Sequence, residues 1–196
     1  MKDVAAALVN TTTRGGPPVS RLVPAALGCV LLAVPACTGD KSETNFDNYK
    51  PLAEAIGKAD RVVLYEGLPH QVFEAKLLET ERKEKKTVEH HGFPFYSEPL
   101  ELKGDDGQKL IALFTDPGSF SKLTEWKRCG GFHPDYLVEY NVGDDVYRML
   151  VCLGCCEVKV YGPKAGLYCD ICGKSKEAFE KVLKPYRKNR PEQKQP

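Results

Sequence analysis

The residues with the clearest capacity for chemistry are cysteines near the C-terminal end of the chain. Two Cys-x-x-Cys pairs, Cys152/Cys155 and Cys169/Cys172, are separated by 13 residues. A gap of two residues lets both thiolates of a pair turn toward one ion, and two such pairs supply the tetrahedral sulfur coordination of a structural Zn²⁺ site. The spacing therefore predicts zinc held by four cysteines, with no position left open for water.

A mixed site is the alternative metal centre. Its ligands are Cys129, His133, Cys152 and Cys155. The first two have a spacing compatible with metal ligation, and the two glycines between them allow a tight loop. Asp135 is then expected to accept a hydrogen bond from the His133 ring and to orient it. The alternative without a metal is a plain loop in which Asp135 caps a turn and His133 is half-buried beside Phe132.

The same cysteines also permit disulfides or redox chemistry. In an oxidising compartment the six cysteines from Cys129 onward tend to pair, in more combinations than a sequence can rank. A Cys-x-x-Cys pair can instead be a redox-active dithiol, with Cys152 or Cys155 as the attacking thiolate. Soft thiolates also suit a Cu(I) carrier, although the chain has only two methionines to support that role. Because Cys155 and Cys156 are adjacent, one of them is expected to lie outside the site.

The first 36 residues have the pattern of a secretory signal. Basic residues precede an apolar run over 22–36, which two prolines interrupt. This run is shorter than the roughly 20 apolar residues that cross a bilayer, and it fits the apolar region of a signal peptide. It ends at Val34-Pro35-Ala36-Cys37, which resembles the lipobox of bacterial lipoproteins. The resemblance implies cleavage before Cys37, a lipid anchor on this cysteine, and a place in the cell envelope, at the outer membrane or on the periplasmic side.

Two further resemblances concern the cysteines. The Cys-x-x-Cys segments resemble the knuckles of treble-clef and zinc-ribbon folds, which implies a structural metal. The Cys-Gly-Gly-Phe-His-Pro-Asp-Tyr and Cys-Leu-Gly-Cys segments are similar to those of small bacterial envelope proteins of uncharacterised activity. That likeness therefore implies no substrate.

Length and charge limit the remaining possibilities. The chain has 196 residues, of which 42% are hydrophobic and 28% charged, as in a soluble globular domain. Its net charge of +1 gives no electrostatic argument for nucleic acid, because phosphate backbones need an excess of Lys and Arg on one face. No nucleic-acid partner is therefore expected.

Apolar periodicity predicts a single α+β domain over residues 48–186. Helices are expected over 49–57, 70–86 and 105–115, and a last helix is expected to end near residue 184. Strands are expected over 61–65, 136–140, 146–151, 157–161 and 165–168. A hairpin of 100–102 with 110–114 is the alternative to the third helix. The strands from 136 onward predict a small antiparallel β-meander with flanking helices, with a C-terminal Cys-rich knuckle followed by a helix. Residues 37–47 are interpreted as the lipidated cysteine and a flexible tether, and 187–196 as a disordered tail.

Two functional hypotheses follow from these features. The first is an exported, lipid-anchored envelope protein with a structural metal or disulfide site, which binds an envelope protein or polymer and is not an enzyme. The alternative is a periplasmic thiol-disulfide oxidoreductase that uses a Cys-x-x-Cys pair. The sequence has no Ser-His-Asp arrangement, phosphate-cradling glycine loop or His-Glu-x-x-His motif, and this favours the first hypothesis.

Overall fold

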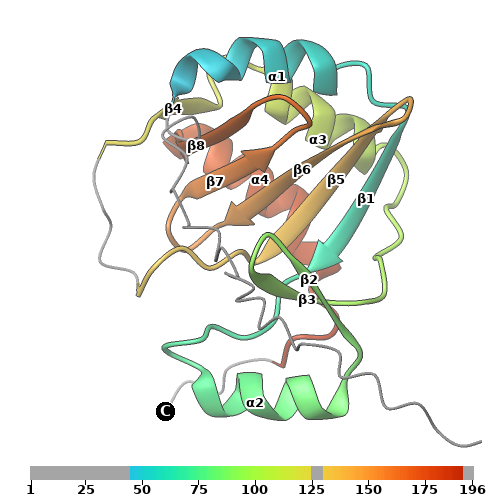
Figure 1. The fold of residues 1–196 in the computed structure, drawn as a ribbon, viewed down its shortest axis with the longest axis vertical. Helices are drawn as coiled ribbons and strands as arrows, with labels where there is room; N and C mark the ends of the chain where they lie inside the picture. Colours follow the sequence, from blue (N-terminus) through green and yellow to red (C-terminus); the bar gives the residue numbers. More distant parts are fainter. Residues whose placement is uncertain (1–44, 125–129, 192–196) are drawn as a thin grey trace, which may run out of the picture. The chain divides into compact units, whose positions relative to one another are not determined.

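The computed structural model describes residues 45–124 and 130–191. Its centre is an antiparallel sheet with the strand order β1-β5-β6-β7-β8-β4 (Figure 1). The strands are β1 Arg61–Glu66, β4 Phe120–Lys122, β5 Tyr136–Val142, β6 Asp145–Cys152, β7 Glu157–Tyr161 and β8 Gly166–Ile171. Strands β5 to β8 are consecutive in the chain and adjacent in the sheet. The predicted α+β class and β-meander are therefore confirmed.

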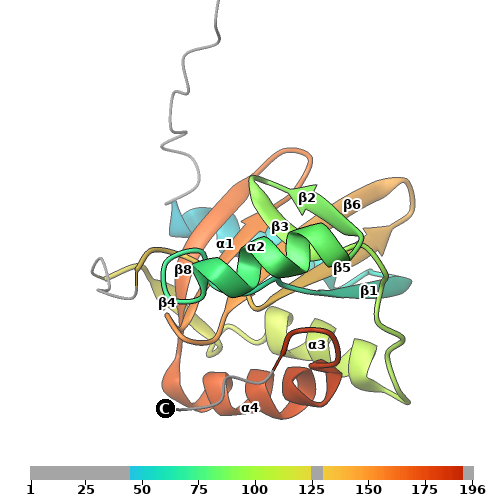
Figure 2. The ribbon, with the colours of Figure 1, turned by 90° about the horizontal axis from the view of Figure 1, so that it is seen from below.

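Helices cover one face of this sheet. They are α1 Tyr49–Ile56, α3 Asp106–Thr115 and α4 Gly173–Leu183, with the short 3₁₀ helices η1 Phe46–Asn48 and η2 Lys184–Tyr186. Figure 2 shows α3 and α4 together on this side. Their apolar residues pack on the side chains that β5 and β6 turn toward them, among them Val138, Tyr140, Met149 and Val151. Burial of this apolar surface is the main stabilising contribution to the fold.

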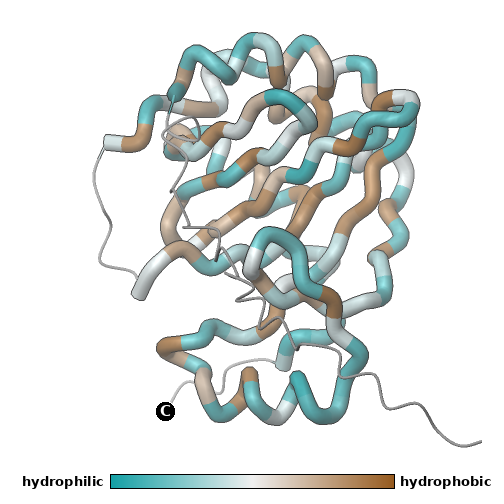
Figure 3. Tube along the Cα trace, in the orientation of Figure 1, coloured by the Kyte–Doolittle hydropathy of each residue, from teal (hydrophilic) through white to brown (hydrophobic). Residues whose placement is uncertain are grey.

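A β-hairpin packs on the opposite face of the sheet. It consists of β2 Thr87–His90 and β3 Phe93–Tyr96, and it follows α2 Ala75–Glu84 in the chain (Figure 2). Phe95 of this hairpin forms a smaller core with Leu137 and Leu150. Two cores arise because successive residues of a strand point to opposite faces of the sheet. In Figure 3, α2 is largely hydrophilic, in agreement with the solvated helix face expected for its charged residues.

The segment before α2 differs from the prediction. The helix expected over 70–86 begins only at Ala75, because residues 70–74 form a turn that His70 holds. The N–H of His70 donates to the Glu74 carboxylate at 2.6 Å, and its ring Nδ1 accepts from the N–H of Val72 at 3.0 Å. These side-chain bonds compete with helical hydrogen bonds and delay the start of the helix.

Two smaller expectations concern His90–His91 and residues 105–115. The polar segment before Gly92 predicts an exposed loop for His90 and His91. This holds for His91, which is exposed in the turn after β2 with its ring stacked on Tyr161 (centroids 3.7 Å apart), but His90 lies half-buried in β2. The alternative hairpin of 100–102 with 110–114 is not formed, since 110–114 belong to α3. The predicted signal peptide and the lipidated Cys37 lie outside the described residues. Within the described residues, the structure contains no helix with the length and apolar composition that a membrane span requires.

Candidate functional site

The first Cys-x-x-Cys pair closes a tight turn between β6 and β7. Cys152 is the last residue of β6, and the N–H of Cys155 donates to its Sγ at 3.1 Å. Cys156, the next residue, has a φ of 56°, a left-handed backbone conformation that leads the chain into β7. Cys152 and Cys155 are each only 3% exposed. The turn therefore holds two buried thiols side by side at the end of β6.

Hydrogen bonds at this turn favour a thiolate on Cys152. The thiol of Cys155 donates to Cys152 and is the largest cause that lowers the Cys152 pKa. Backbone N–H groups of His133 and Cys155 also donate to this sulfur and act in the same direction, whereas burial opposes them. A thiolate is the form of cysteine that binds metals and attacks disulfides. The surroundings of Cys152 thus favour its thiolate form.

The loop over 130–135 packs against this turn. The Sγ of Cys155 lies 3.8 Å from the Gly131 carbonyl oxygen, and the N–H of Asp135 donates to the Val151 carbonyl at 2.7 Å. With the hydrogen bond from the His133 N–H, these contacts place His133 beside the thiol pair. His133, Cys152 and Cys155 of the mixed set therefore line one pocket, without converging as metal ligands in the described residues. The fourth member, Cys129, lies outside the described residues.

The environment of His133 determines which ring nitrogen carries the proton. Its Nε2 lies 2.8 Å from the Leu68 carbonyl oxygen, which can only accept, so Nε2 carries the proton and Nδ1 keeps its lone pair. The residue is 8% exposed, and burial is the main cause that lowers its pKa, which favours the neutral ring. A neutral imidazole with a bare Nδ1 is a form that can ligate a metal.

A second histidine, His70, lies against this ring. The two ring centroids are 4.6 Å apart, and His70 is 9% exposed. Because the His70 Nδ1 accepts from backbone N–H groups, its proton is on Nε2, which has no hydrogen-bond partner among the described residues. In this pair of adjacent rings, the Nε2–H of His70 is a donor and the Nδ1 of His133 has a lone pair. No sequence pattern marks His70 as a site residue, since it is distant in the chain from every cysteine of the site.

Asp135 has a different role from the one expected. Its carboxylate accepts from the N–H of Leu153 at 2.8 Å and from the Arg190 guanidinium at 2.9 Å, whereas the His133 ring bonds to Leu68. The expectation that Asp135 orients the His133 ring is therefore wrong. Because Leu153 follows Cys152 directly, Asp135 instead positions the Cys152–Cys155 turn.

Arg190 connects this site to the C-terminal segment. Its guanidinium pairs with both Asp135 and Glu74, and its side chain is 11% exposed. The Glu66 carboxylate, on a residue only 1% exposed, accepts from the backbone N–H groups of Lys188, Asn189 and Arg190. The polar composition of 187–196 predicts a disordered tail. Residues 187–191 are instead held against the domain, because a buried carboxylate needs these donors.

The second Cys-x-x-Cys pair lies away from the first. In the paired strands, Cys152 is opposite Glu157 and Glu157 is opposite Asp170, whereas Cys169 is opposite Val158. Paired residues point to the same face, so Cys152 and Cys169 point to opposite faces of the sheet. Cys169 is fully buried in the helix-side core, and Cys172 precedes α4. The structure thus does not bring the four cysteines together, and Cys152, Cys169 and Cys172 are all free thiols.

Cys169 is expected to be chemically inert in the folded protein. Burial raises its pKa well above the ordinary value of a thiol, so its reactive thiolate is scarce. Alkylation with iodoacetamide at about pH 8, followed by peptide mass analysis, should leave Cys169 unmodified until the protein is denatured. The half-buried Cys172 should react before denaturation and serves as the control. Rapid native modification of Cys169 would contradict its placement in the core.

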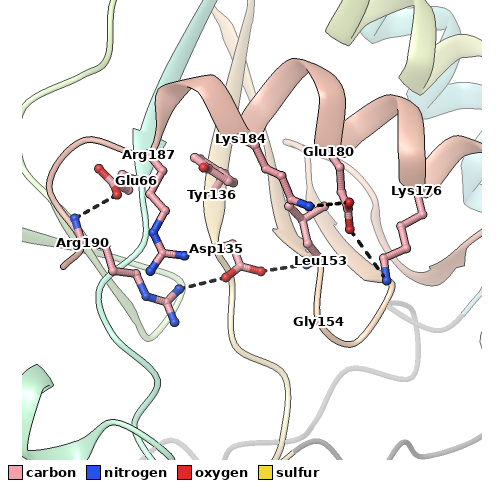
Figure 4. A pocket seen from close by; sticks show the side chains of 10 residues that line it. All are labelled: Glu66, Asp135, Tyr136, Leu153, Gly154, Lys176, Glu180, Lys184, Arg187 and Arg190. Carbon is pink, nitrogen blue, oxygen red and sulfur yellow. Dashed lines mark hydrogen bonds and ion pairs between the residues drawn. The ribbon is translucent and has the colours of Figure 1, made fainter. Parts of the chain in front are cut away.

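Two pockets flank the Cys152–Cys155 turn. One, of about 340 Å³, is lined by Cys152, Cys155 and both buried histidines, with Phe73 at its exposed edge. The other, of about 250 Å³, lies between the turn and α4 (Figure 4). Asp135, Gly154 and Arg190 belong to the walls of both. In the ranges 45–124 and 130–191, no three His, Cys, Asp or Glu side chains already converge as metal ligands.

Comparison with known proteins adds no relative. No family model matches the chain, and no curated protein and no solved structure matches it.

Proposed function

We propose that the protein is exported, is anchored through a lipid on Cys37, and carries a zinc site with a binding or structural role rather than a catalytic one. The proposed ligands are Cys129, His133, Cys152 and Cys155. The lipid anchor makes the membrane its first partner. An envelope protein or polymer is the further partner that we expect.

The packing of the 130–135 loop on the Cys152–Cys155 turn is the observation that supports this ligand set. Two adjacent thiols, one of them favoured as thiolate, and an imidazole with a bare Nδ1 are the donor types that Zn²⁺ prefers. The thiol pair would bind first, and binding would draw the His133 Nδ1 and Cys129 onto the ion. The four-cysteine set has no such support, because Cys169 points to the other face of the sheet.

Mass spectrometry of the full chain, purified in detergent, tests this proposal. Under native conditions we expect a mass greater by one zinc ion, which denaturation removes. The variant Cys169→Ala should retain the zinc, whereas Cys152→Ser should lose it. Loss of zinc from Cys169→Ala would restore the four-cysteine set, and a metal-free native protein would contradict both sets.

The two histidines provide a matched pair for the same measurement. Replacing His133 with Asn should weaken zinc binding by about tenfold or more, since a ligand is lost. Replacing His70 with Asn should leave zinc content unchanged, because the His70 Nδ1 already accepts backbone hydrogen bonds. Equal effects of both substitutions would argue against His133 as a ligand.

A thiol-disulfide oxidoreductase is the second candidate function. It is favoured by the hydrogen bond from the Cys155 thiol to Cys152, because the Cys152 thiolate could attack a substrate disulfide and Cys155 could then displace the product. The electrons would pass to the substrate and leave a Cys152–Cys155 disulfide. The 3% exposure of both residues opposes this candidate, since attack needs access. In the same mass measurement it predicts no zinc and a two-proton loss that glutathione readily reverses.

A further inference from the structure

The pocket shown in Figure 4 lies on the side of the Cys152–Cys155 turn that faces α4. Its walls come from the start of β5, the turn itself, α4 and the C-terminal segment. The charged residues of these walls are Glu66, Asp135, Lys176, Glu180, Lys184, Arg187 and Arg190. Seven of the ten lining residues are thus ionic, and the others are Tyr136, Leu153 and Gly154.

Positive charge is concentrated in the part of the chain that forms this pocket. Residues 173–191 contain seven Lys and Arg and only two Glu, although the whole chain has a net charge of only +1. The segment has five more positive than negative side chains, of which the carboxylates of Glu66, Glu74 and Asp135 that contact it offset three, so a smaller positive excess remains. Four of these cations line the pocket.

The carboxylates of the pocket are already engaged within the protein. Glu66 accepts from the C-terminal segment, and Asp135 accepts from Leu153 and Arg190. Glu180 pairs with Lys176 at 3.8 Å and with Lys184 at 2.6 Å. Each negative group therefore has internal donors, and none of them faces the pocket as an isolated charge.

Arg187 differs from the other cations. Within the part of the chain that the structure describes, its guanidinium forms no ion pair, and its Nη2 donates to the Pro191 carbonyl at 3.1 Å. Figure 4 shows this side chain pointing toward Asp135 and Arg190. In the neighbouring wall, the buried Nε of Arg190 also has no hydrogen-bond partner among the described residues. The pocket thus has in its wall one exposed guanidinium, that of Arg187, without an ion pair among the described residues, and a second arginine, Arg190, whose buried Nε has no partner there.

We propose that this pocket binds a phosphate-class oxyanion. A guanidinium presents two parallel donors that match phosphate oxygens, and Lys176 and Lys184, which share the single carboxylate of Glu180, add one net positive charge on the opposite wall. A volume of about 250 Å³ accommodates such an anion. Free phosphate and a phospholipid headgroup share this chemistry. The proposal does not depend on a metal at the cysteines.

Isothermal titration calorimetry on the full chain in a zwitterionic detergent tests this proposal. The probes are inorganic phosphate and a short-chain phosphatidylglycerol below its micelle concentration. We expect saturable binding of one of them with a Kd below about 1 mM. Tighter binding of the lipid would assign a headgroup as the source, and tighter binding of phosphate would assign a free anion.

Two variants of the C-terminal segment decide whether the pocket is responsible. Arg187→Gln should weaken binding by about tenfold, the effect of losing one charge-assisted contact. Lys188→Gln removes the same charge from the next residue, whose side chain does not line the pocket, and should change binding by less than about twofold. Equal weakening by both variants, or no saturable binding of either probe, would overturn the proposal. Unchanged melting of Arg187→Gln would show that any loss is not due to unfolding.

Discussion

Replacing Cys152 by serine is expected to abolish the proposed zinc binding and to lower the free energy of unfolding by about 3 kcal/mol or more. Cys152 is 3% exposed, and its sulfur accepts from two backbone N–H groups and from the Cys155 thiol. A serine oxygen is smaller and lies closer to the backbone, so these donors would lose their acceptor. In a metal-bound protein the variant also loses the binding energy that the ion contributes to folding.

The matched control is Cys156→Ser in the same turn. Cys156 is half-buried, and its thiol donates to the Leu153 carbonyl at 3.7 Å. Serine keeps the same backbone, so this variant should lose less than about 1 kcal/mol. Urea unfolding of both variants provides the measurement. A Cys152→Ser protein that melts within about one degree of wild type would disprove the central role of this residue.

A chelator separates the two contributions to this loss. If metal binding stabilises the fold, a chelator should lower the stability of the wild type toward that of Cys152→Ser and should leave the variant unchanged. If the loss instead comes from hydrogen bonds alone, the chelator should affect neither protein. This second outcome would mean that the turn stabilises the fold through its hydrogen bonds and that zinc does not contribute to the stability.

The β-meander could be predicted from the sequence, but the arrangement of the cysteines could not be predicted from their spacing. Alternating apolar residues predicted β5 to β8 and their antiparallel order, because each strand has one face in the helix-side core. The same alternation explains why the two Cys-x-x-Cys pairs do not form one four-cysteine site. Leu167, Cys169 and Ile171 follow the period of a strand and lie in one core. The spacing of the cysteines takes no account of this periodicity. It therefore predicted a single metal site from two pairs that the sheet separates.

The remaining site residues could not be predicted because their contacts are long-range. Arg190 pairs with Glu74, which is 116 residues away in the chain, and Glu66 accepts from residues more than 120 positions later. No local pattern marks such partners. A polar C-terminal segment has the composition of a disordered tail. Residues 187–191 are ordered because the buried Glu66 carboxylate accepts hydrogen bonds from backbone N–H groups of this segment.

Replacing Arg190 by methionine is expected to destabilise the protein by about 3–5 kcal/mol. The Glu74 side chain is 3% exposed and that of Arg190 11%, so the pair is shielded from water. Removing the guanidinium would leave the Glu74 carboxylate buried without its counter-charge, and Asp135 would lose a donor as well. Methionine conserves much of the side-chain length, so the loss reports on charge rather than on a cavity.

Two further variants show whether the buried pair causes this loss. Lys188→Met alters an exposed neighbour that contributes its backbone N–H to Glu66, and it should cost less than about 0.5 kcal/mol. Glu74→Gln, combined with Arg190→Met, removes the buried charge while an amide oxygen still accepts from the His70 N–H. The double variant should therefore be more stable than Arg190→Met alone in urea unfolding. If the two substitutions are additive instead, the carboxylate is not the group that Arg190 stabilises, and the C-terminal segment must be held by Glu66 alone.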